Sequence, residues 1–424
     1  MIVVKRYVLS GADLIDGTGG PVIADSMVVF EGGCIVYAGE RADRFVTADA
    51  EHWQLAGKTI VPGLIEAHTH ATFDADLKAY IKNGITTIRY AGLDHSDVRR
   101  VRERIDAGKV VGPRILSAGR MIDEPPVAYP EWSLAVGTAA EAAIIAERMI
   151  LEEKVDALIV TQRVTAAVMK AVIDAAHAHR RRVIGQTWAV DGETAAKLGI
   201  DELHTSSRVY RGRLYPEERL LRYQSIADRL GLASRAWASL DWDMTLPIME
   251  AMVQRDVCYC GMQVITQFQV GEGVAYLEDD SDFHTFFSER EHQAFRDFTR
   301  RLQGSWTAED LEWGRRANDM RMEWMQRFRS LGGQLLAGTD MQFGGIMLHR
   351  ELANLEALGM SPLQVITTAT GACATALQLD HEIGFVKQGL KADLVVLERS
   401  PLQDLGALRA IDRVLKNGEI VNGW

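Results

Sequence analysis

The chain has 424 residues, of which 47% are hydrophobic and 25% are charged, a composition typical of a globular protein with a large core. Its formal net charge of -11 argues against binding to phosphate backbones, and no apolar run approaches the roughly 18 to 20 residues that cross a bilayer. We therefore expect neither a nucleic-acid nor a membrane partner, but a small-molecule substrate.

The first segment, MIVVKRYVLSGADLIDG, places a basic pair after an apolar start and reaches glycine before a signal-peptide core could form. This pattern predicts a cytoplasmic protein.

Both ends of the chain carry short apolar runs separated by glycine-bearing turns, which predict β-strands. These runs occupy residues 7–15, 26–40, 58–63, 384–402 and 411–421. We expect residues 1–61 and 386–424 to form one small composite β-sandwich.

Between the two ends, short strand-like runs alternate with amphipathic helical stretches such as 97–108 and 139–154. Alternating strands and helices predict parallel βαβ units. The strand-like runs are residues 84–92, 112–119, 155–160, 181–188 and 333–340. The predicted fold class is α/β, with a (β/α)8 TIM-type barrel over residues 62–385.

Residues 265–330 differ from the rest, because many aromatic and acidic residues occur there with few strand patterns. We predict a helical lid inserted into the barrel. The alternative is that most of these aromatic side chains only fill the core of the lid itself.

The segment VPGLIEAHTH, residues 61–70, enters a parallel strand with its apolar run. The two-residue period of a strand places Glu66, His68 and His70 on one face. At the carboxyl end of a barrel strand, such a histidine pair could chelate a metal ion.

Several ordered motifs resemble the amidohydrolase superfamily, particularly its imidazolonepropionase-like and prolidase-like branch. They are VPGLIEAHTH, GITTIR, GPRILSAGR, LLAGTD, LHRELANLEALGMSPLQVITTATGACATAL, IGFVKQGLKADLVVLERSPL and VLKNGEIV. Several matches in one order are more specific than any single motif.

The resemblance implies that His68 and His70 bind a divalent metal, and that Asp340 is both a ligand and the general base that takes a proton from water. The alternative for Asp340 is a turn residue that caps the following helix. We expect one metal ion, most simply zinc.

The ligand set of two-metal relatives is incomplete. Ile159 and Val160 stand where they carry a bridging lysine, and Gln186 stands where they carry a histidine. The sixth-strand histidine could survive as His204, which would then assist as a ligand and in catalysis, although the spacing leaves Thr205 as the alternative inward residue.

Three further features concern the substrate. Strand alternation puts Trp188 on the face of Gln186, so both could contact substrate. Arg89 could bind an anionic group or pair with a buried carboxylate. The loop RMIDEPPVAYPEW, residues 120–132, departs from the glycine- and histidine-rich loop of many relatives, so substrate contacts there are rebuilt.

The leading hypothesis is therefore a metal-dependent hydrolase that cleaves an amide, a cyclic C–N bond or a related acyl bond. A non-hydrolytic lyase or isomerase is the first alternative, and a non-catalytic binding protein is the second. The aromatic residues favour an apolar or ring-bearing substrate, and the few basic residues near the motifs argue against phosphate esters. Relatives often associate, so a homo-oligomer is possible.

Overall fold

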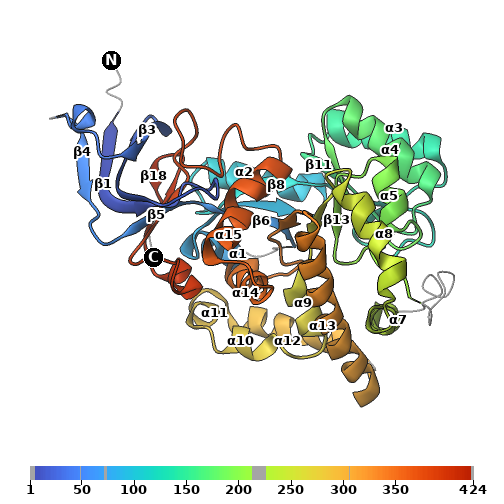
Figure 1. Cartoon of the computed structure of the whole chain (residues 1–424). Coiled ribbons are helices and arrows are strands. Elements are labelled where there is room, and N and C mark those ends of the chain that lie inside the picture. Colours follow the sequence, from blue (N-terminus) through green and yellow to red (C-terminus); the bar gives the residue numbers. More distant parts are fainter. Residues whose placement is uncertain (1–4, 48, 71–73, 213–225, 305, 422–424) are drawn as a thin grey trace.

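The computed structural model describes residues 5–47, 49–70, 74–212, 226–304 and 306–421. Its two chain ends meet in one sheet, which lies at the left of Figure 1 in blue and red. The strands are β1 (Arg6–Leu14), β2 (Ile23–Glu31), β3 (Cys34–Glu40), β4 (Glu51–Gln54), β5 (Thr59–Pro62), β16 (Leu394–Leu397), β17 (Ile411–Lys416) and β18 (Glu419–Ile420).

These strands are hydrogen-bonded in the order β18-β17-β16-β5-β1-β2-β3, with β4 also paired to β1. The two ends are joined where β16 runs antiparallel to β5, with Leu397 opposite Thr59. Because β1 pairs with β2, β4 and β5, the ladder is continuous. The strands therefore form one continuous ladder, and their packing as a sandwich remains a prediction. The domain boundaries at residues 61 and 386 remain predictions.

Alternation along β16 explains how this sheet attaches to the rest of the protein. Leu394 and Val396 pack into the core of the sheet itself, whereas Val395 and Leu397 pack into the larger core of the molecule. Both faces of the strand are therefore buried.

The central part is an α/β structure with two parallel sheets, which confirms the predicted class. One sheet has the order β6-β7-β8, and the other has the order β10-β9-β11-β12-β13-β14-β15. The strands are β6 (Leu64–Thr69), β7 (Ile85–Tyr90), β8 (Arg114–Ser117), β9 (Met121–Asp123), β10 (Ser133–Ala135), β11 (Ala157–Gln162), β12 (Arg182–Thr187), β13 (Glu202–His204), β14 (Cys258–Cys260) and β15 (Leu335–Leu336).

The described strands do not form a single closed ladder, which differs from the barrel expected. Backbone hydrogen bonds nevertheless cross both borders between the two sheets. The amide of Ala67 donates to the carbonyl of Ala337 at 2.8 Å, and the amide of Asp156 donates to the carbonyl of Ser117 at 2.7 Å. In each of these two bonds one residue, Ala337 or Asp156, lies just outside its strand, so neither bond extends a ladder.

Helices follow most of the parallel strands, as the alternating pattern predicts. Several of them begin at side-chain caps; Thr138, Thr165 and Asp191, for example, accept hydrogen bonds from backbone amides. The helices outside the lid segment are α1 (Asp74–Lys82), α2 (His95–Asp106), α3 (Ala139–Leu151), α4 (Ala166–Ala178), α5 (Gly192–Leu198), α7 (Ile226–Ala238), α8 (Trp242–Val253), α14 (Gly344–Ala357), α15 (Pro362–Thr367) and α16 (Cys373–Ala376). Short turns of other helix types are η1 (Asp43–Phe45), η2 (Thr368–Ala372) and η3 (Leu405–Arg409).

The predicted lid segment is helical in its described residues. It contains α9 (Gln263–Gln269), α10 (Val274–Glu278), α11 (Ser281–Phe286), α12 (Glu289–Gln303) and α13 (Ala308–Ser330), drawn in yellow and orange in Figure 1. Phe283 and Phe295 pack edge to face with Phe343, so several aromatic residues fill a core, as the alternative interpretation expected. Phe298 instead lines the cavity described below.

No helix among the described residues is both long enough and apolar enough to span a membrane.

Candidate metal centre and substrate cavity

The centre of the site is the point where β6 ends beside the turn after β15. The amides of Thr339 and Asp340 both donate to the carbonyl of His68, at 3.1 and 3.0 Å. Asp340 has a positive φ of 56°, a conformation that aspartate tolerates better than most residues. A Cβ at Gly338 would lie 2.6 Å from the Cys260 sulfur, so this close approach requires glycine.

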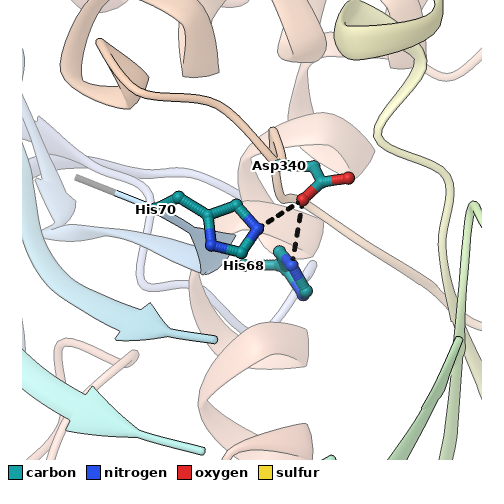
Figure 2. A group of neighbouring side chains, drawn as sticks. All are labelled: His68, His70 and Asp340. Carbon is teal, nitrogen blue, oxygen red and sulfur yellow. Dashed lines mark hydrogen bonds and ion pairs between the residues drawn. The ribbon is translucent and has the colours of Figure 1, made fainter. Parts of the chain in front are cut away.

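This turn directs the Asp340 carboxylate at two imidazoles, as Figure 2 shows. The Asp340 Oδ1 atom lies 2.7 Å from His70 Nε2 and 3.2 Å from His68 Nε2. One ligand atom from each of the three residues can be chosen so that all lie within 4.8 Å of one another. The group is therefore compact enough to hold one metal ion.

Behind His68 lies a row of buried charged and polar side chains. Arg89 donates to both carboxylate oxygens of Glu202, at 2.9 and 2.5 Å. The other Glu202 contact is with His204 Nε2 at 3.1 Å, and His204 Nδ1 lies 2.8 Å from His68 Nδ1. All four side chains are almost completely buried.

The pKa shifts fix the proton positions along this row. Burial opposes the charge on Glu202, but Arg89 outweighs it and holds the pKa of Glu202 well below its usual range. Burial also lowers the pKa of His204, and it lowers the pKa of His68 to about 3, so both rings are neutral. An ionised carboxylate only accepts hydrogen bonds, so His204 Nε2–H donates to Glu202 and His68 Nδ1–H donates to His204.

This tautomer leaves an unshared electron pair on His68 Nε2. The atom is buried, makes no hydrogen bond, and faces Asp340 Oδ1. Burial favours the neutral form of Asp340, but its contacts with His68 and His70 outweigh burial and hold the pKa of Asp340 well below its usual range. Two electron-pair donors that face each other without a shared proton fit a cation between them, so the donor set suits a divalent metal.

The group of possible metal ligands His68, His70 and Asp340, called the metal group below, lies beside a cavity of about 590 Å³. His70 and Asp340 form part of its wall, together with Gln186, Trp188 and Thr205. This volume is in the range of small-molecule sites.

Comparisons with known proteins agree with this architecture. The model of the amidohydrolase family matches residues 330–423, a range that contains Asp340 and the strands β16 to β18. The resemblance to the amidohydrolase superfamily is confirmed. No curated protein matches the sequence.

Solved amidohydrolase-type structures share the fold over almost the whole chain. A Xaa-Pro dipeptidase with bound methionine is 18% identical with a TM-score of 0.71, covering 99% of this chain and 100% of its own. The A. niger ochratoxinase is 16% identical with a TM-score of 0.72, covering 99% and 96%. A bottromycin amidohydrolase is 19% identical with a TM-score of 0.74, covering 98% and 86%.

The structure separates the residues that the amidohydrolase resemblance singled out. Gln186 and Trp188 line the cavity, and so does Thr205, whereas His204 and Arg89 do not. His204 lies outside the compact metal group, with both ring nitrogens directed at His68 and Glu202. The placement of Arg89 corresponds to the ion-pair alternative, and Arg89 does not line the cavity.

Ile159, at the position of the bridging lysine in two-metal amidohydrolases, is fully buried. It belongs to an apolar cluster with Ala118, Met121 and Ile184. This position therefore offers no ligand atom.

Sequence reasoning missed most of the cavity wall. Few basic residues stand near the motifs in the sequence, but α7, α12 and α13 bring Arg229, Arg301 and Arg321 to the cavity. The aromatic side chains that line the cavity and that the sequence did not single out for this role are Tyr129, Trp132, Tyr210 and Trp237. One sequence signal pointed to part of this set. The loop at residues 120–132, which contains Tyr129 and Trp132, departs from the glycine- and histidine-rich loop of many amidohydrolase relatives.

We expect Gln186→His to strengthen zinc binding, because imidazole binds zinc more strongly than a neutral amide oxygen does. Zinc affinity should be measured by competition with a chelator. Gln269→His is the matched control, since Gln269 lines the same cavity from α9. Equal zinc affinity in Gln186→His and the parent would show that position 186 does not contribute to zinc binding.

Proposed function

We propose that the protein is a metal-dependent hydrolase of the amidohydrolase type, which cleaves an amide or a cyclic C–N bond in a small ring-bearing molecule. The observation that carries this proposal is buried His68 Nε2, which has no hydrogen-bond partner and lies 3.2 Å from the Asp340 carboxylate beside a cavity. We also propose that the eight strands β6, β7, β8 and β11 to β15 are the expected barrel, closed through the two border hydrogen bonds.

In this proposal His68, His70 and Asp340 hold one zinc ion. When bound, the ion supplies a Lewis acid and lowers the pKa of water. Asp340, the only carboxylate of the group, accepts the proton from water and returns it to the leaving nitrogen. Because both nitrogens of His204 are engaged, it positions His68 and fixes its tautomer without touching substrate.

The retained ligand group and the family match favour hydrolysis over the non-hydrolytic and binding-only alternatives. The test is turnover by zinc-loaded and metal-stripped protein over a panel of aryl amides, lactones and cyclic ureas. Hydrolysis that depends on zinc supports the proposal. A protein that never binds zinc, or that transforms a panel member without water addition, contradicts it.

We expect the double variant His68→Ala/His70→Ala to lose bound zinc, whereas the parent should hold about one ion per chain because Ile159 cannot bridge a second. Elemental analysis after dialysis gives the metal content. The matched control is His177→Ala/His179→Ala, a second pair with the same spacing at the end of α4, which should keep its zinc. Zinc retained by the first variant, or two ions in the parent, would contradict the proposed site.

A further inference from the structure

Two arginines in the cavity wall are buried without a carboxylate partner among the described residues. Arg229 is 4% exposed and Arg321 is 6% exposed. Within the part of the chain that the structure describes, neither forms an ion pair with an acidic residue. A buried guanidinium is costly unless an anion or another strong acceptor compensates its charge.

Aromatic rings hold both guanidiniums in place. The Arg229 guanidinium carbon lies 5.2 Å from the Tyr129 ring centre and 5.8 Å from that of Trp188. Arg321 lies 5.2 Å from the Trp237 ring centre. Ring contacts attract a cation, but they leave the edge of the guanidinium, with its N–H donors, available to another group.

The donors of Arg321 are only partly used. One terminal nitrogen donates to Asn318 Oδ1 at 3.1 Å, and the buried Nε has no hydrogen-bond partner. Burial lowers the pKa of Arg321 to about 10, so the side chain still carries its charge at neutral pH. A charged side chain with an unused donor lines the cavity.

A wall of stacked rings connects this region to the metal group. The His70 ring stacks on Trp132 at a centroid distance of 5.4 Å, and Trp132 stacks on Tyr129 at 5.9 Å. Arg229 lies against the other end of this wall, beside Tyr129. A ring-bearing ligand that lies along the wall can therefore reach both His70 and Arg229.

Acidic groups in the cavity lining do not neutralise these arginines. The lining contains Glu131, which is exposed, and Asp340, whose carboxylate is engaged by His68 and His70. Three arginines, including the exposed Arg301, therefore face two carboxylates in the cavity lining.

We propose that Arg229 and Arg321 form an anion subsite, and that the ligand of this cavity is a ring-bearing carboxylic acid whose carboxylate binds there. The planar guanidinium matches a carboxylate through two parallel hydrogen bonds. The stacked rings take the apolar part of the ligand. This inference deepens the proposed function, because it names the substrate class of the same cavity, but ligand binding at the arginines does not require the metal.

The test compares binding of 1-naphthaleneacetate with binding of its neutral analogue, 1-naphthaleneacetamide, by calorimetry. The parent should prefer the acid. Arg321→Met and Arg229→Met should each weaken acid binding by roughly 10- to 100-fold, the size of a lost charged hydrogen bond, and leave amide binding nearly unchanged. The matched control is Arg316→Met, because Arg316 also lies over a tryptophan, Trp313 on α13, but is exposed and outside the cavity.

Thermal melting separates loss of binding from loss of fold. Arg321→Met should melt at the same or a higher temperature than the parent, because methionine keeps the apolar contact and removes an uncompensated buried charge. If Arg321→Met does not fold, Arg229→Met gives the same comparison. Equal binding of acid and amide by the parent, or an unchanged acid preference in the folded arginine variants, would overturn the proposal.

The His68→Ala/His70→Ala protein distinguishes this inference from the proposed function. Acid preference in that variant, which should lack zinc, supports the anion subsite whatever the reaction is. Zinc-dependent hydrolysis without any acid preference would retain the proposed function and reject the anion subsite.

Discussion

We expect Asp340→Asn to lower kcat by on the order of 10²- to 10⁴-fold, which is the usual contribution of a general base. The amide has nearly the same shape as the carboxylate but cannot take a proton from water. Turnover of a substrate found in the panel, metal content and thermal melting should be measured together. Retained zinc with lost turnover would assign the loss to proton transfer, and lost zinc would assign it to ligation.

The exposed Asp174→Asn is a control for loss of one negative charge, because Asp174 lies on the outer side of α4 in an ion pair with Lys170. Its turnover should equal that of the parent. A rate within a few-fold of the parent in Asp340→Asn would remove Asp340 from the mechanism.

The second large effect concerns stability. We expect Arg89→Met to lower the free energy of unfolding by about 3 to 5 kcal/mol, because Glu202 would remain buried without its partner. Chemical denaturation measures this loss. Arg89→Met/Glu202→Gln should recover most of it, since the amide oxygen still accepts from His204. Lys170→Met removes an exposed ion pair and should change stability by less than about 0.5 kcal/mol.

The pH dependence of Arg89→Met should differ from that of the parent. In the parent the depressed pKa of Glu202 contributes stability above its unfolded value of 4.5, and this contribution is lost as the pH falls below that value. In Arg89→Met, burial is no longer opposed by Arg89 but only by the contact with His204, so the pKa of Glu202 rises and the penalty diminishes as the pH falls. The stability difference between variant and parent should therefore be larger at about pH 8 than at about pH 5. A difference that does not change with pH would show that Arg89 does not determine the pKa of Glu202.

The metal group could be predicted because its signals are local. Strand alternation places His68 and His70 on one face of a single strand, and the motif around Asp340 follows another strand directly. The same rule places Glu202 and His204 on one face of β13, where Glu202 contacts both His204 and Arg89.

The cavity wall could not be predicted, because its side chains come from elements with no shared period or spacing. Trp132 lies in the loop after β9, Arg229 on α7 and Arg321 on α13, and only the tertiary fold brings them together. The two parallel sheets illustrate a related limit. Short strands such as β15, which has only two residues, carry too little pattern to show how a ladder continues.

The pairing of β5 with β16 also bears on the order of events during synthesis. Thr59 leaves the ribosome long before its partner Leu397 is made, so the edge of β5 stays open while most of the chain is translated. An open, apolar strand edge is a site for unwanted pairing with other nascent chains. Completion of this sheet is therefore a late, long-range step. Until β16 has been made, the open edge of β5 must be shielded from pairing with other chains.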